Sequence, residues 1–173
     1  MILVTGGAGY IGCVVVEKLL KKGEAVRVLD KLYFGEEGLA HVRNNVDLVQ
    51  GDIRSFDPSV LDGVDAVIHL GGLSNDPTAE YNPKANMEIN FAGTKKLAEA
   101  CKKKGVNRFV FASSCSIYDK GLFADDVLQD ETSEVHPRAT YAVSKLEAEK
   151  LLLGMTDKDF CPVVLRQGTV YGF

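Results

Sequence analysis

The sequence lacks the features by which membrane, disulfide-bonded and metal-binding proteins are recognised. No apolar run among its 173 residues approaches the roughly 20 residues of a membrane span, and no signal-peptide pattern precedes the first expected strand. Its four cysteines are scattered without a C-x-x-C pair or a metal-ligand spacing. We therefore expect a cytoplasmic protein with reduced, mostly buried thiols, no metal and no membrane contact.

A strong charge of either sign is also absent. The net charge of -4 argues against a nucleic-acid partner. The one basic run, Lys102 to Lys104, ends a helical stretch just before Gly105, where cations complement the helix dipole, so we interpret it as a solvated helix end. With 46% hydrophobic and 25% charged residues, the composition fits one globular domain over residues 1–173.

What the sequence does contain is a glycine-rich segment, Thr5 to Gly12, between an apolar run and a helical pattern. Its spacing is G-x-x-G-x-x-G, with glycines at 6, 9 and 12. In a phosphate-binding strand-to-helix junction one glycine permits a tight turn, one lets the backbone approach a pyrophosphate, and one lets helix and strand pack closely. The N–H groups and the dipole of the helix then face the phosphates. The alternative, an ordinary glycine-rich turn, has to be weighed by context.

The second expected strand, 26–30, supplies that context because it ends in Asp30 at the spacing of a ribose-binding carboxylate. A carboxylate accepts hydrogen bonds from the ribose 2′-hydroxyl and repels a 2′-phosphate, so Asp30 favours NAD over NADP. Arg27 and Lys31 would soften that preference if either turned toward the ribose. The alternative for Asp30 is a residue of a strand-end turn.

The rest of the chain predicts a doubly wound parallel α/β sheet, the Rossmann fold. Short β-branched or aromatic runs, typical of strands buried on both faces, follow at 46–50, 66–70, 108–112 and 162–166. A helix is expected from about Pro83 to Lys104, with one face formed by Met87, Phe91, Thr94, Ala98 and Cys101.

Ligands of such sheets bind at the carboxyl ends of the strands, where several candidate residues fall. Asp52 is placed to hydrogen-bond an adenine amino group, with Ile53 packing on the ring, although a helix N-cap role fits Asp52 nearly as well. Gly71 and Gly72 would let the backbone approach a cofactor closely. His69 is flanked by apolar residues without an acidic partner, so we interpret it as a structural histidine.

Tyr141 and Lys145 open a later helical run, and a spacing of four residues places them on one helix face. A tyrosine acts as a base near neutrality only if its phenolate is stabilised, which a nearby ammonium does electrostatically. By itself this spacing is common on amphipathic helix surfaces. Following the glycine-rich segment and the serine cluster 113–116, it predicts a catalytic pair.

Over its whole length the chain resembles the extended short-chain dehydrogenase/reductase family, in particular the NAD-dependent nucleotide-sugar epimerases and dehydratases of the UDP-glucose 4-epimerase-like type. The segments that carry the resemblance are Thr5 to Gly12, Asp30, Gly51 to Arg54, His69 to Gly72, Asn90 to Thr94, Ser113 to Tyr118, Tyr141 to Lys145 and Leu165 to Gly172. The resemblance implies Tyr141 as the base, Lys145 as the partner that lowers its pKa, and Ser114 as the hydroxyl that binds the reacting oxygen of the sugar. Ser114 is preferred to Ser113 and Ser116 because the family's catalytic Ser or Thr lies four residues before the tyrosine that matches Tyr118.

Residues and resemblance together give a predicted cofactor site for NAD. Its members are Gly6, Gly9, Tyr10, Ile11, Gly12, Asp30, Asp52, Ile53, Leu70, Gly71, Gly72, Asn90, Tyr141 and Lys145.

The implied reaction begins when Tyr141 removes the proton of the sugar 4-hydroxyl while C4 gives its hydride to NAD⁺, which forms a 4-keto sugar. The family's dehydratases place Asp-Glu where this chain has Cys115 and Ser116, and its decarboxylases usually place a glutamate at the latter position. Neither side chain replaces a carboxylate at neutral pH, so epimerisation or 4-keto reduction is expected, and Asp30 together with the family's retained NAD favours epimerisation. Asp119 and Thr169 also depart from the family's usual glycine and asparagine, which leaves the substrate open. The acidic loop 119–136 is expected to be a solvated excursion.

The resemblance also implies a C-terminal substrate-binding region beyond Phe173, so we expect the chain alone to turn over a substrate negligibly. A non-catalytic NAD-binding module is the alternative, although it would need neither Tyr141 nor Lys145. In the family, helices such as 83–104 pair subunits, which implies a homodimer.

Overall fold

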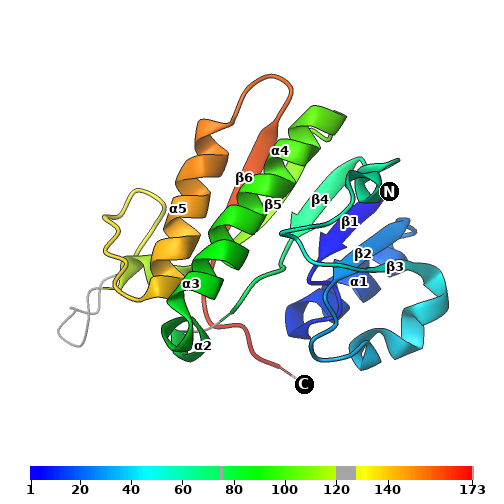
Figure 1. The fold of residues 1–173 in the computed structure, drawn as a ribbon, viewed down its shortest axis with the longest axis horizontal. Helices are drawn as coiled ribbons and strands as arrows, with labels where there is room; N and C mark the ends of the chain where they lie inside the picture. The colour runs from blue at the N-terminus through cyan, green and yellow to red at the C-terminus, as the bar shows by residue number, and fades with distance from the viewer. Residues whose placement is uncertain (75, 120–127, 173) are drawn as a thin grey trace.

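Six parallel strands form the centre of the protein in a computed structural model that describes residues 1–74, 76–119 and 128–172 (Figure 1). The strands are β1 (Ile2–Thr5), β2 (Val26–Asp30), β3 (Val46–Gln50), β4 (Ala66–His69), β5 (Arg108–Ser114) and β6 (Cys161–Gln167). Their order in the sheet is β3-β2-β1-β4-β5-β6. In the register, Ile2 of β1 pairs with Val26 on one side and with Ala66 on the other. This is the predicted Rossmann order, in which the direction of strand addition reverses between β1 and β4.

Helices cover both faces of the sheet, as expected for a doubly wound fold. The helical segments are α1 (Tyr10–Lys21), α2 (Asp76–Tyr81), α3 (Pro83–Asn86), the π-helical η3 (Met87–Gly93), α4 (Thr94–Lys104), α5 (Thr140–Gly154) and the 3₁₀ segments η1 (Glu37–Asn45), η2 (Pro58–Leu61) and η4 (Cys115–Tyr118). Figure 1 shows α4 and α5 side by side across β5 and β6, while α1 packs against β1 and β2. Among the described residues no helix combines the length and the apolar character needed to cross a membrane.

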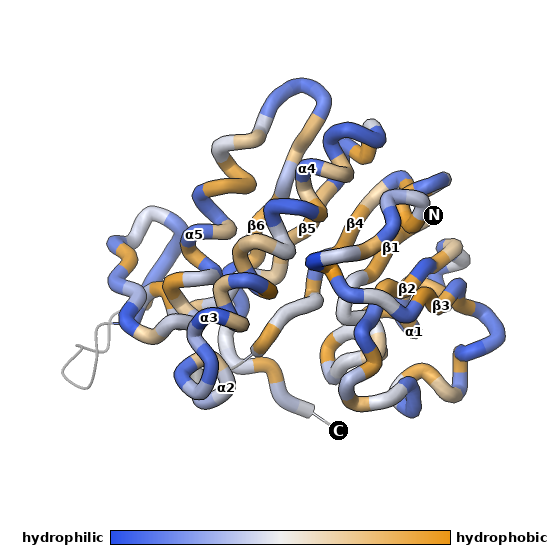
Figure 2. The backbone as a smooth tube through the Cα atoms, viewed as in Figure 1, coloured by the Kyte–Doolittle hydropathy of each residue, from blue (hydrophilic) through white to orange (hydrophobic). Residues whose placement is uncertain are grey.

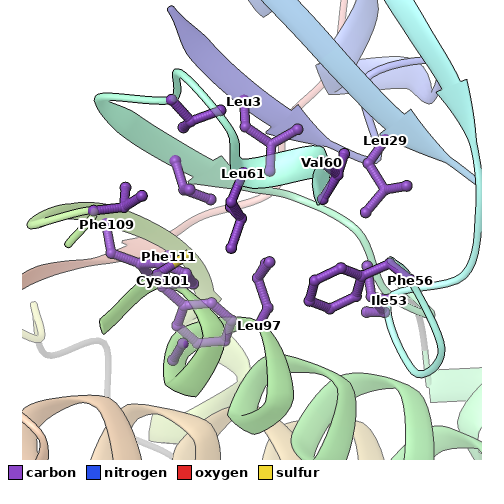
Figure 3. Close-up of a cluster of buried hydrophobic side chains, with 14 of the residues drawn as sticks. Leu3, Leu29, Ile53, Phe56, Val60, Leu61, Leu97, Cys101, Phe109 and Phe111 are labelled. Carbon is purple, nitrogen blue, oxygen red and sulfur yellow. The ribbon is translucent and has the colours of Figure 1, made fainter. Parts of the chain in front are cut away.

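Neighbouring residues of β1 illustrate the burial of both faces. Leu3 and Val4 are each fully buried but belong to different apolar clusters. Leu3 packs with side chains such as Phe109 and Leu97 on the α4 and α5 face (Figure 3), and Val4 packs with Val16 of α1 on the other. Figure 2 shows the corresponding pattern along the chain, with hydrophobic strands between more hydrophilic loops and helix surfaces. All six strand predictions are confirmed: 26–30 and 46–50 coincide with β2 and β3, and the ends of the other strands differ by at most two residues.

The predicted helix 83–104 is present as α3, η3 and α4, but the π-helical η3 changes the face that it buries. Asn86 and Asn90 are buried in its amino-terminal half, whereas Met87 and Phe91 are only partly buried. A π-helical turn adds a residue to the helical repeat, and such turns are frequent at functional sites. The predicted apolar face is therefore fully buried only from Thr94 onward, although Phe91 still packs against the core.

The cysteine prediction is wrong for two of the four thiols. Cys101 is buried and Cys13 is partly buried, but Cys115 and Cys161 are exposed. Cys161 begins the edge strand β6, and Cys115 follows the carboxyl end of β5, so neither lies under a helix. The basic run 102–104 does end α4, and Gly105 follows in the left-handed conformation with φ of 75°.

Tight packing at Gly12 predicts that Gly12→Ala destabilises the protein. A Cβ there would lie 2.1 Å from the carbonyl oxygen of Gly6, which is backbone and cannot swing away. We expect a loss of about 2 kcal/mol in the free energy of unfolding, measured by urea denaturation. Gly154→Ala is the matched control, because a Cβ at that helical position meets nothing within 4 Å. It should be neutral or stabilising, and equal losses in both variants would contradict the packing argument.

Candidate active site

The glycine-rich segment between β1 and α1 divides the three predicted roles among its glycines. Gly6 turns the chain with φ of +70°, a conformation that favours glycine. Gly12 lies against the backbone of Gly6 and Gly7, as close packing of helix and loop requires. A Cβ on Gly9 would approach only the carbonyl oxygen of Gly6, at 3.3 Å. Gly9 is the N-cap of α1, and no side chain caps that end of the helix. The first backbone N–H groups of α1 are therefore left for the adjoining cavity, which Gly9 to Gly12 line.

Asp30, at the end of β2, is joined to this loop. Its Oδ2 accepts a hydrogen bond from the backbone N of Ala8 at 3.0 Å, and its Oδ1 accepts one from the backbone N of Leu32 at 2.8 Å. Leu32 has a φ of 57°, so the chain bends sharply just after Asp30. The carboxylate is thereby fixed at the edge of the cavity beside the glycine loop.

The two cations near Asp30 have different environments. Arg27 forms an ion pair with Asp47 at 2.6 Å and donates to the carbonyl oxygen of Val60 at 2.9 Å, outside the cavity that the glycine loop lines. Lys31 does line that cavity, but its ammonium lies 2.9 Å from Oδ2 of Asp52. Arg27 therefore cannot bias the choice between NAD and NADP, and the positive charge of Lys31 is already paired with Asp52.

Asp52 is surrounded by cations. Besides Lys31, it accepts from Nη2 of Arg54 at 2.6 Å and from the backbone N of Arg54 at 2.9 Å. The hydrogen bond from Arg54 is the main reason that the pKa of Asp52 lies well below its usual range. No helix begins here, because the next helical segment starts at Pro58 with Asp57 as its cap, so the N-cap alternative for Asp52 is wrong. Ile53 packs into the core and also lines the cavity.

His69 is a structural residue, as predicted. Its buried ring lies between two threonines, with Nδ1 2.6 Å from Oγ1 of Thr5 and Nε2 2.8 Å from Oγ1 of Thr94. Because Thr94 donates to the carbonyl oxygen of Asn90, it accepts from Nε2, and Thr5 therefore donates to Nδ1. Burial lowers the pKa of His69 to about 3, so the ring is neutral at physiological pH.

Asn90 departs from the predicted cofactor set because it does not line the cavity. Its buried amide instead holds Leu73, accepting from the backbone N at 2.8 Å and donating to the backbone O at 2.9 Å. Its Nδ2 also donates to Oδ1 of Asn86 at 2.8 Å. Asn90 therefore fixes the segment after β4 through the backbone of Leu73. The residues of that segment that line the cavity include Leu70, Gly71 and Gly72.

The serines after β5 separate into different roles. Ser113 is buried and donates to Glu149, whereas Ser114 donates from Oγ to Oγ of Ser116 at 3.0 Å. Ser114 accepts from the backbone N of Ser116 at 3.2 Å and lines the cavity. The sequence-based preference for Ser114 over Ser113 agrees with this geometry, because the Ser113 hydroxyl is already held by a carboxylate.

Tyr141 and Lys145 share one face of α5 and both line the cavity. The Lys145 ammonium lies 5.7 Å from the centre of the Tyr141 ring and 4.9 Å from that of Phe111, and it donates to the carbonyl oxygen of Ala112 at 2.9 Å. Burial lowers the pKa of Lys145 to about 8, an effect that the Glu149 carboxylate partly opposes. Lys145 is therefore mainly protonated at pH 7, and it presents a poorly solvated positive charge beside the phenol.

Glu149, which is buried, forms an ion pair with the partly buried Arg166 that the sequence-based reasoning missed. Nη2 of Arg166 lies 2.9 Å from Oε2 of Glu149, and the Glu149 side chain is only 2% exposed. Arg166 also donates through Nη1 to the hydroxyl of Tyr118 at 2.7 Å, so the pair joins α5, β6 and η4. The signal that could have found it is the four-residue spacing from Lys145 to Glu149, which continues the catalytic face by one turn.

One cavity of about 950 Å³ collects these groups. Every predicted cofactor residue except Asn90 lines it, as does Ser114, and Thr169 closes its wall after β6. The glycine loop stands beside Asp30 at one part of the wall, with Tyr141 and Lys145 elsewhere along it. A dinucleotide fits this lining, because N–H groups suit its pyrophosphate, Asp30 suits a ribose hydroxyl, and Gly71 and Gly72 leave the wall bare of side chains.

The chain is similar to known proteins in both sequence and structure. Residues 2–173 match the sequence profile of the NAD dependent epimerase/dehydratase family. The chain is 30% identical over 177 residues to UDP-N-acetyl-alpha-D-glucosaminuronate decarboxylase of Bacillus cytotoxicus, covering 98% of this chain and 54% of that protein. It is 35% identical over 161 residues to UDP-glucose 4-epimerase 3 of Oryza sativa subsp. japonica, and the alignment covers 86% of this chain and 42% of that protein.

Among solved structures, the UDP-glucose 4-epimerase of Thermus thermophilus in complex with NAD superposes with a TM-score of 0.84 at 32% identity. The alignment covers 95% of this chain and 54% of that one. The chain spans about half the length of the curated relatives that it matches.

The ion pair of the buried Glu149 carboxylate predicts that Glu149→Gln strongly destabilises the protein, because Arg166 keeps its positive charge when the negative charge that balances it is removed. We expect a loss of about 3 kcal/mol in the free energy of unfolding, measured by urea denaturation. Glu147→Gln on the same helix is the control, since that carboxylate forms an exposed pair with Lys150 at 2.8 Å. The control should change stability by less than about 0.5 kcal/mol. Similar losses in the two variants would refute the role of the pair.

Proposed function

Because this chain belongs to the NAD-dependent epimerase/dehydratase family, we propose that it binds NAD and supplies the proton-transfer residues of an enzyme that epimerises a nucleotide sugar. The observation that carries the proposal is the shared cavity. Ser114, Tyr141 and Lys145 line the same space as Gly9 and Asp30, although they come from distant parts of the chain.

The residues divide the chemistry in a simple way. The residues that would hold NAD⁺ are Asp30 and those of the glycine loop, and the cofactor would supply the acceptor for a hydride from a carbon that carries a hydroxyl group. Tyr141 takes the proton of that hydroxyl, and the Lys145 ammonium stabilises the phenolate that acts as the base. Because Lys145 is buried, its charge is poorly screened by water and acts strongly on the phenol. The Ser114 hydroxyl, oriented by Ser116, binds the reacting oxygen of the sugar.

Epimerisation is favoured over the other reactions of the family by the two residues after Ser114. Elimination of water needs an acid and a base next to the substrate, and Cys115 and Ser116 occupy those positions. A 4-keto reduction uses the same three groups and is the second candidate. A non-catalytic NAD-binding module fits less well, because burial of the Lys145 ammonium costs stability that such a module has no reason to lose.

Activity of the complete gene product tests this proposal. It is incubated with NAD⁺ and a panel of nucleotide sugars, and the products are identified by NMR. We expect a C4 epimer from one substrate, and Tyr141→Phe should lower its rate of formation at least about a hundredfold because the base is lost. Tyr81→Phe is the matched control, since Tyr81 is 92% exposed and lies outside the cavity. Undiminished turnover by Tyr141→Phe, or no oxidation of any sugar, would refute the proposal.

A further inference from the structure

Lys31 is a cation at the wall of the cofactor cavity whose charge is held by other residues. It directly follows Asp30, the carboxylate expected to bind the adenosine ribose, so it stands where a cation would attract a 2′-phosphate. Its ammonium contacts Oδ2 of Asp52 at 2.9 Å and donates to the Tyr33 hydroxyl. It also lies 4.5 Å from the centre of the Tyr33 ring.

We propose that Asp52 is a specificity determinant that favours NAD over NADP by holding Lys31 in an ion pair and so withholding its charge from a 2′-phosphate. The inference rests on the proposed binding of NAD. It assigns to Asp52 a role that acts through Lys31, in addition to any contact with the adenine ring.

The geometry around Asp52 explains why this carboxylate can hold two cations. Arg54 binds both of its oxygens, with Nε 3.0 Å from Oδ1 and Nη2 2.6 Å from Oδ2, which fixes the orientation of the side chain. The Asp52 side chain is only 16% exposed, while that of Lys31 is 38% exposed. A fixed, ionised and largely buried carboxylate is therefore the anchor, and the long lysine side chain is the movable partner.

The neighbouring cation Arg27 is also held in an ion pair with an aspartate. It is paired with Asp47 and donates to the carbonyl oxygens of Val60 and Asp62, away from the glycine loop. Both cations that flank the ribose carboxylate in sequence are thus neutralised by an aspartate of the next strand or loop. Only Lys31 lines the cofactor cavity, so only its ion pair can affect the choice of nucleotide.

The test is a double-mutant cycle on the purified chain, with the dissociation constants of NAD⁺ and NADP⁺ measured by isothermal titration calorimetry. Asp52→Asn should improve the affinity for NADP⁺ relative to NAD⁺ by about tenfold, because Lys31 is released. The ratio of the two affinities removes any equal effect on adenine binding. In a Lys31→Met background the same Asp52→Asn change should move the ratio by less than about twofold.

The cycle separates an effect through Lys31 from simple loss of a negative charge. An equal improvement with and without Lys31 would mean that Asp52 repels the phosphate directly, and it would overturn the inference. Lys31→Met alone keeps the test valid if Asp52→Asn folds poorly. It should leave the ratio nearly unchanged, whereas a large fall in relative NADP⁺ affinity would show that Lys31 already reaches the phosphate.

Two further results complete the test. Asp47→Asn is the matched control, since it frees Arg27 outside the cavity and should not alter the ratio. A rise in that variant would contradict a role confined to Lys31. Unchanged ratios in every variant, with NAD⁺ still bound, would refute this inference alone. Absence of binding of either nucleotide to the wild-type chain would overturn the proposed function as well.

Discussion

The site depends on a close approach of two backbone segments at the reversal point of the sheet. β1 and β4 are neighbours there, and the glycines that follow them, Gly6 and Gly71, lie so close that a Cβ on Gly6 would be 2.7 Å from the backbone N of Gly71. Side chains at this point would separate the loops and fill the cavity. Because both loops stay bare, the N–H groups of the α1 terminus and the wall after β4 border the same space.

A chain of buried hydrogen bonds fixes that approach from behind. The backbone N of Gly71 donates to Thr5 Oγ1 at 3.2 Å, and the series continues through His69 and Thr94 to the carbonyl oxygen of Asn90. It joins β1, β4 and the π-helical segment η3 without using a charge. On the other side of the cavity a charged network has the corresponding role, because Glu149 holds Arg166 and Ser113 and supports the ammonium of Lys145. The first network fixes the cavity wall after β4, and the second fixes the surroundings of Lys145.

Most of the fold was predictable because parallel strands buried on both faces give continuous apolar runs, as in Phe109 to Ala112, and because glycine spacing reports backbone geometry directly. The placement of Tyr141 and Lys145 on one helix face was predictable, since a spacing of four residues within α5 brings them together. That the Asn90 amide faces Leu73 and Asn86 was not predictable, because the extra residue of η3 rotates the helix and a π-helical turn has no simple sequence signal. The pairing of Lys31 with Asp52 was not predictable either, because it joins residues of different loops whose distance only the register of β2 and β3 determines.

Hydrogen exchange followed by mass spectrometry, with and without NAD⁺, tests the central claim most directly, namely that the glycine loop and the wall after β4 form one dinucleotide site. NAD⁺ should slow exchange in peptides covering residues 6–12 and 70–73 and leave the distant carboxyl end of α4, residues 99–104, unchanged, because bound phosphates cover the N–H groups of the first segment. Unchanged exchange in residues 6–12, or protection confined to the outer surface around Asp47 and Ser59, would contradict the account.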